Sequence, residues 1–108
     1  MADEARKAFD QLTADYDGKP GVTTGKMMSA DGLRIEGKIF AMFWHDSLVV
    51  KLPAAVAAGI VAGGGGQVFE PGPGRKMREW VVFEFEDDLE LWRKMTADSF
   101  EYVVSLIK

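Results

Sequence analysis

Six consecutive apolar residues between two turn signals constrain the fold of this 108-residue chain more than any other feature. They run from Ile39 to Trp44, after Glu36-Gly37-Lys38, where a glycine suits a tight hairpin, and before the turn His45-Asp46-Ser47. A strand that is apolar at every position must be covered on both faces, so we interpret this run as the central strand of a sheet. We expect Ile39, Ala41 and Phe43 to point to one side, and Phe40, Met42 and Trp44 to the other.

Two further strands are predicted beside this run. Residues Leu33 to Glu36 alternate apolar and charged side chains, which is typical of a strand with one solvated face. Leu48 to Leu52 returns as a third strand, which Pro53 ends because proline has no backbone donor. The first of the three is expected to begin near Val22 and to contain a bulge or bend at Ser29 to Gly32.

The remaining elements follow from periodicity and from glycine and proline positions. They are a helix from about Asp3 to Tyr16, an alanine-rich helix at Ala54 to Ala62, strands at 67–70 and 80–85, and an amphipathic helix from Leu89 to Ile107. Tight turns between consecutive strands predict one α+β domain over residues 1–108, in the order α, three strands, α, two strands, α. Its antiparallel sheet would have five strands, with the helices mainly on one face.

Charge and composition exclude several classes of function. Thirteen basic and seventeen acidic side chains give a net charge of −4, so we expect no direct binding to nucleic acid. The chain has no cysteine and one histidine, which leaves no thiolate metal site. No stretch approaches the ~20 apolar residues that span a membrane, and the charged N-terminus is unlike a signal peptide. We expect a cytoplasmic protein that does not contact membranes.

Three features that suggest chemistry have simpler explanations. The four glycines at Gly63 to Gly66 lead into Gln67-Val68-Phe69 and a strand, whereas a phosphate-binding loop needs Gly-Lys-Ser/Thr before a helix. His45, Asp46 and Ser47 are neighbours in one turn, where side chains splay apart and do not form a catalytic triad. The carboxylates from Glu84 to Glu90 could bind a hard cation, but a capped helix start explains them more simply. We therefore predict no catalytic residue, no metal and no cofactor.

Two surfaces are predicted to make contacts. Arg75, Lys76 and Arg78 form a basic spot on an acidic protein and could bind an anion or an acidic partner; the alternative is a solvated turn that pairs with Glu70 or Glu79. The sheet face without helices would expose apolar side chains, which suggests a homodimer interface. The alternative is that the C-terminal helix covers this face. The predicted interface residues are Phe40, Met42, Trp44, Trp80 and Val82.

Several sequence blocks occur in a characteristic order over most of the chain. They are Lys26-Met27-Met28, Gly32 to Ala41, Leu48 to Leu52, Phe69-Glu70-Pro71 and Arg75 to Val81. On these blocks, above all the glycine-lysine turn and the Phe-x-Pro through Met-x-x-Trp-Val segment, the chain resembles the N-terminal domain of TfoX/Sxy proteins. The resemblance implies an α+β fold akin to type III secretion chaperones and a link to transcriptional regulation of competence. It carries no catalytic residue onto this chain.

The function predicted from these observations is a non-enzymatic regulatory or protein-interaction module, whose partner could be a transcription factor. The alternative is a small-molecule-binding domain with a pocket between the sheet and the C-terminal helix. Its predicted lining is Trp80, Trp92 and Met95.

Overall fold

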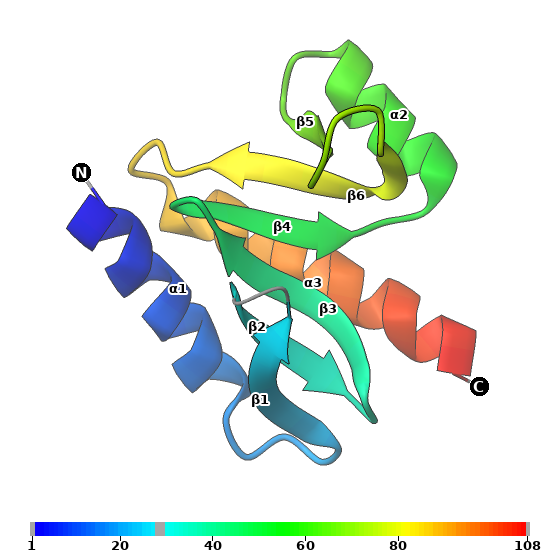
Figure 1. Cartoon of the computed structure of the whole chain (residues 1–108). Helices are drawn as coiled ribbons and strands as arrows, with labels where there is room; N and C mark the ends of the chain where they lie inside the picture. Colours follow the sequence, from blue (N-terminus) through cyan, green and yellow to red (C-terminus); the bar gives the residue numbers. More distant parts are fainter. Residues whose placement is uncertain (1, 28–29, 108) are drawn as a thin grey trace.

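Three helices and one antiparallel sheet of six strands form the part of the chain that the structure describes, residues 2–27 and 30–107 of a computed structural model (Figure 1). The strand order is β1-β2-β3-β4-β6-β5. The predicted α+β class is confirmed, and none of the described helices is long and apolar enough to cross a membrane. In chain order the elements are α1 (Ala2–Tyr16), β1 (Val22–Met27), β2 (Ala30–Ile35), β3 (Lys38–Trp44), β4 (Ser47–Lys51), α2 (Ala54–Ala62), β5 (Gln67–Phe69), β6 (Met77–Glu84) and α3 (Leu89–Ile107).

The sheet has six strands and not the predicted five, because the chain reverses its direction between Met27 and Ala30. These two residues lie opposite each other in the antiparallel register of β1 and β2. The predicted bend is therefore wrong for Ala30 to Gly32, which belong to β2, and Ser29 lies outside the described residues. The sequence did not reveal this hairpin because Met28-Ser29 lacks the glycine or asparagine that usually marks a short turn.

A β-bulge lies where β2 meets β3. Leu33 is opposite Ala41, whereas the next residue, Arg34, is opposite Ile39. Phe40 is therefore an extra residue in β3, with no partner of its own in β2. A bulge of this kind interrupts the alternation of side chains along a strand.

The bulge turns Phe40 toward the helices. Its side chain is 0% exposed, and its ring centroid lies 5.3 Å from that of Tyr16 in α1 and 5.1 Å from that of Phe100 in α3. The prediction that Phe40 shares a face with Met42 and Trp44 is wrong. Strict alternation holds only in a strand without a bulge.

The main core lies between the sheet and the helices, on the face that we call the helix side. In Figure 1, α3 passes behind β3 and β4. The alanine-rich α2 joins the same core through Ala57, which is 1% exposed. Apolar residues of α1 and α3 recur at helical spacing. They pack against every second residue of the strands, the ones that point toward the helices. Fully or nearly fully buried members include Phe9, Leu12, Leu33, Leu48, Val50, Val81 and Trp92.

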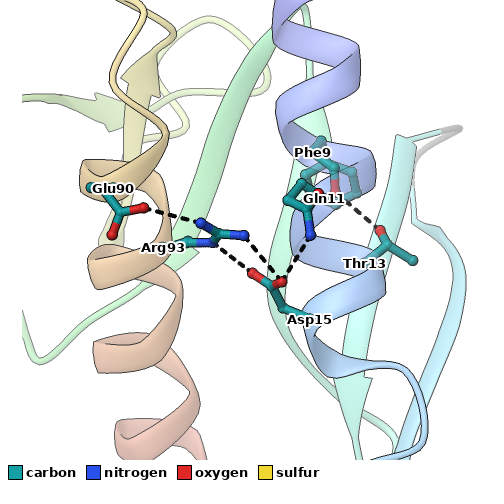
Figure 2. Close-up of polar contacts among 6 residues, drawn as sticks. All are labelled: Phe9, Gln11, Thr13, Asp15, Glu90 and Arg93. Carbon is teal, nitrogen blue, oxygen red and sulfur yellow. Dashed lines mark hydrogen bonds and ion pairs between the residues drawn. The ribbon is translucent and has the colours of Figure 1, made fainter.

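A charged contact links α1 to α3 at the surface (Figure 2). The Arg93 guanidinium donates to both carboxylate oxygens of Asp15, at 2.9 and 3.3 Å, and to Glu90 at 3.0 Å. The hydrogen bond from Arg93 lowers the pKa of the Asp15 carboxyl; partial burial opposes this shift, and a hydrogen bond from Gln11 adds to it. Partly exposed ion pairs contribute little free energy, so this contact mainly orients the two helices.

The side chain of Ser99 in α3 forms hydrogen bonds with two backbone groups at the point where β3 and β4 stop pairing. The Ser99 hydroxyl donates to the Phe40 carbonyl oxygen at 2.6 Å and accepts from the Lys51 amide at 3.0 Å. Beyond the pair of Ala41 and Val50, these two strands no longer pair. Ser99 is 0% exposed, so its hydroxyl replaces water for both backbone groups.

Candidate functional site

A second, smaller apolar cluster lies on the opposite face of the sheet, which we call the open face. Met42, Val49 and Phe69 are at most 2% exposed there, although the helices lie on the other face. Large side chains of the face itself cover them: the rings of Trp44 and Phe69 meet edge to face at 5.4 Å. The other members are only partly buried. The full cluster is Met42, Trp44, Val49, Phe69, Met77, Trp80 and Val82.

Four of the five predicted interface residues come together on the open face, and Phe40 is the exception. The register places Met42 opposite Val49, and Val49 opposite Val82, which makes a continuous apolar row across three strands. The sequence analysis missed Val49, Phe69 and Met77. Val49 could have been found, because every residue from Leu48 to Val50 is apolar. Phe69 lies opposite Met77 only after a register shift between β5 and β6, which the sequence does not show.

The alternative in which the C-terminal helix covers the open face is wrong. Trp92 and Val103 of α3 belong to the core of the helix side, and Ser99 bonds the backbone from that side. The helix is therefore committed to the other face of the sheet. Among the described residues, the partly buried apolar side chains packed against this cluster all come from strands β3 and β6 of the sheet itself.

The basic spot precedes and enters β6. Arg75, Lys76 and Arg78 are all exposed, and none forms an ion pair with another described residue. The two carboxylates that could neutralise them are engaged elsewhere. Glu70 accepts a hydrogen bond from the Gly74 amide at 2.9 Å. Glu79 accepts one from the Tyr102 hydroxyl at 3.2 Å and lies 3.9 Å from the Lys51 ammonium. The predicted pairing with Glu70 or Glu79 is absent from the described residues.

A shallow apolar groove lies beside this spot, which we call the α2 groove. Its volume is about 650 Å³. Alanine and valine side chains of α2 line it together with Val68 of β5 and two of the three predicted cations. Arg75 is not part of its lining. The lining residues are Ala54, Ala55, Ala57, Ala58, Val61, Ala62, Val68, Lys76 and Arg78.

A pocket also lies between the sheet and the C-terminal end of α3, but not where it was predicted. Trp92 is 0% exposed and Met95 is 8% exposed, so both are core residues, and neither belongs to the lining of this pocket. The actual pocket, of about 420 Å³, includes Trp80 of the predicted set. We call it the end pocket. It is lined by Arg34, Gly37, Lys38, Ile39, Lys51, Trp80, Val103, Leu106 and Ile107.

The residues that first suggested chemistry lie outside the α2 groove and the end pocket, and the His45 ring lies 4.7 Å from that of Trp44 on the open face. His45 and Asp46 form the exposed β3–β4 turn at φ 49° and 62°, and Ser47 begins β4 at 7% exposure. No hydrogen bond joins their side chains within the described part of the chain. The glycine run connects α2 to β5, where a Cβ at Gly66 would lie 2.8 Å from Val81. Over residues 2–27 and 30–107, no three carboxylate or imidazole groups gather as metal ligands would.

None of the protein families, curated proteins or solved structures compared with this chain matches it.

Proposed function

We propose that this protein is a non-enzymatic interaction module that binds an acidic, partly apolar segment of a partner protein in the α2 groove. One observation carries the proposal. Lys76 and Arg78 border an apolar groove, and the nearby carboxylates of Glu70 and Glu79 are engaged with other groups. The groove thus combines apolar surface with uncompensated positive charge on a chain whose net charge is −4.

The shape and composition of the groove favour a peptide segment. Alanine side chains are short, so another backbone can approach α2 closely, and an amphipathic helix can place its apolar residues along such a groove. Carboxylates on the flank of that helix would then reach Lys76 and Arg78. Charge complementarity of this kind selects partners and speeds association more than it adds affinity.

The partner class in this proposal comes from the resemblance to the N-terminal domain of TfoX/Sxy proteins. That resemblance implies a link to transcriptional regulation, and we therefore propose a transcription factor as the binding partner. The module would then act on transcription through a protein contact and not through DNA. The named secretion-chaperone-like fold and the link to competence belong to the same proposal.

A labelled acidic amphipathic peptide of about 15 residues, with leucine on one helical face and glutamate beside it, tests the groove directly. The full chain should bind it at low salt, and added salt should weaken binding. The variant Lys76→Glu/Arg78→Glu should bind about tenfold more weakly or worse, because two attractive charges become repulsive. Fluorescence anisotropy gives both affinities.

The matched control is Lys7→Glu/Lys94→Glu, which makes the same charge change on exposed helix positions outside the groove. It should leave peptide affinity within about twofold of the parent chain. Ala58→Glu, in the exposed wall of the groove, should weaken binding without changing the positive residues. Equal losses in the groove variants and the control would show non-specific attraction and contradict the proposal.

Direct DNA binding should be absent. Titration of a labelled duplex at low salt is the most sensitive test, because low salt strengthens purely electrostatic association. Saturable binding under those conditions would contradict a module that acts through protein contacts alone.

A second candidate function is binding of a small anionic molecule in the end pocket. The favouring observation is that Lys38 and Lys51 line it together with the indole of Trp80 and apolar side chains of α3. Its volume falls within the usual range for ligand pockets. A thermal-shift screen of aromatic and short-chain carboxylates tests this, because a ligand of the folded state raises the melting temperature. A hit whose shift disappears in Lys51→Gln would favour this candidate over the peptide-binding module.

A further inference from the structure

The path of the chain fixes the direction in which α2 lies along β6. Leu52, two residues before α2, donates its amide hydrogen to the Glu79 carbonyl oxygen at 2.8 Å, so α2 begins beside the early residues of β6. After α2 the chain returns as β5, whose first residue, Gln67, lies opposite Val82. The helix α2 therefore extends from the early residues of β6 toward the late ones (Figure 1).

The groove is positively charged where α2 begins. Lys76 and Arg78, which we call the basic end, line the groove and form no ion pair with another described residue. The first turn of α2 contains no acidic residue, and no side chain caps it. The positive end of the helix dipole therefore adds to the two side-chain charges, and an anionic group is favoured here.

The region beyond the other end of α2 is negatively charged. Glu84, the last residue of β6, and Glu86 are exposed, and we call them the acidic end. Neither carboxylate forms an ion pair with another described residue. Both line a small pocket together with Gly65, Gly66 and Gln67, which follow α2 in the chain. A cationic group is therefore favoured beyond the C-terminal end of α2.

The two ends specify the charge order of a bound helix. We propose that the partner of the α2 groove is a helix with separated charges, whose carboxylates lie over the basic end and whose cations lie near the acidic end. This inference rests on the proposed function of the groove and specifies its partner. Arg78 and Glu84 are six residues apart in one strand, which corresponds to about 20 Å. A helix covers this length with about 13 residues, so the partner should carry its opposite charges about that far apart, with apolar side chains between them.

The opposite charges of the two ends distinguish this partner from other occupants. A uniformly acidic helix or an anionic membrane surface would be attracted at the basic end and repelled at the acidic end. Insertion into lipid is further disfavoured because the alanine side chains of α2 bury little apolar area. A helix with separated charges is attracted at both ends, and charge complementarity of this kind selects one partner over another.

Two labelled peptides of about 18 residues test the charge order. They have the same composition and the same leucine face, but one carries its glutamates at one end and its lysines at the other, whereas the second alternates them. The parent chain should bind the charge-separated peptide about tenfold more tightly than the alternating one. Glu84→Lys/Glu86→Lys should remove this advantage and should not weaken binding of a uniformly acidic peptide. Fluorescence anisotropy gives each affinity.

Reversal of both ends provides a second test. The fourfold variant combines Lys76→Glu/Arg78→Glu with the reversal of the acidic end, so the charge order of the groove is inverted. The charge-separated peptide can then bind in the opposite direction and should recover the affinity that each double variant loses. Should the fourfold variant fail to fold, the two double variants alone decide. Circular dichroism and melting temperature establish that each variant is folded.

Glu4→Lys/Glu101→Lys is the matched control, because it makes the same charge change at exposed helix positions outside both pockets. It should keep the affinity of the charge-separated peptide within about twofold of the parent value. Equal affinities for the two peptides, or no effect of Glu84→Lys/Glu86→Lys, would overturn the charge order and leave the groove proposal standing. No binding of any of the peptides to the parent chain would contradict the groove itself. A dimer of the parent chain that the peptide dissociates would show that a second copy occupies the groove, and would overturn this inference.

Discussion

The two faces of this sheet are both apolar, but they are buried by different means. On the helix side, Phe40 packs against Tyr16 of α1 and Phe100 of α3, and both Phe40 and Trp92 are 0% exposed. On the open face, Val49 is equally buried, but side chains of the same face cover it while Trp44 and Trp80 remain partly exposed. Apolar patterning therefore shows that a face avoids water without showing what covers it. The two faces therefore differ in that only the open face keeps tryptophan side chains partly exposed.

The largest expected effect comes from truncating one aromatic residue on each face. Phe40→Ala should lower the free energy of unfolding by about 3–5 kcal/mol, because it empties a fully packed site among Tyr16, Phe100 and the sheet. Trp80→Ala should cost only about 1–2 kcal/mol, since its side chain is partly solvated. Urea unfolding gives both values, taken on the monomer at low concentration. Equal costs would mean that Phe40 is not on the helix side.

A smaller effect tests how α3 is fixed to the helix side. Ser99→Ala should cost about 2 kcal/mol, because it leaves the Phe40 carbonyl and the Lys51 amide without their buried partner. Ser105→Ala is the matched control on the same helix, where the exposed hydroxyl bonds only to Tyr102 of its own turn. It should change stability by less than about 0.5 kcal/mol. Indistinguishable urea midpoints for the two variants would refute the bridging role of Ser99.

The smallest effect concerns the charged contact between α1 and α3. The pKa of Asp15 is lowered in the folded chain, so its contribution to stability is present above its usual value of 3.8 and is lost as pH falls through the lowered value. Asp15→Asn should therefore lower the melting temperature slightly at pH 7, and this deficit should shrink as the pH falls below 3.8. Thermal melts across this range give the comparison. A deficit that stays the same size as the pH falls would show that the effect does not arise from the Asp15 charge.

The elements of the fold were largely predictable, because local signals govern them. The helix at Ala54–Ala62 has the predicted bounds, and the apolar run from Ile39 to Trp44 is indeed an interior strand. The errors arise where the structure depends on how one strand pairs with another. The hairpin after Met27 and the bulge at Phe40 depend on the register between strands. This register cannot be predicted from the alternation of apolar residues within one strand.

The contact surfaces could be predicted only in part for the same reason. Trp44, Trp80, Met42 and Val82 were expected together on one face, because each follows from the alternation of its own strand. The α2 groove was not foreseen. It forms because the packing of α2 against β5 and β6 brings alanines near Lys76 and Arg78, which lie some twenty residues later in the chain.

The central claim is that helices seal one face of the sheet while the other offers aromatic side chains for contact. The three tryptophans report on both faces, so ¹⁹F NMR of the chain labelled with 5-fluorotryptophan tests the claim most directly. In dilute protein, a soluble paramagnetic agent should broaden the resonances of Trp44 and Trp80 and spare that of Trp92. A Trp92 signal as accessible as the others, or Trp44 and Trp80 signals as protected as that of Trp92, would contradict the account.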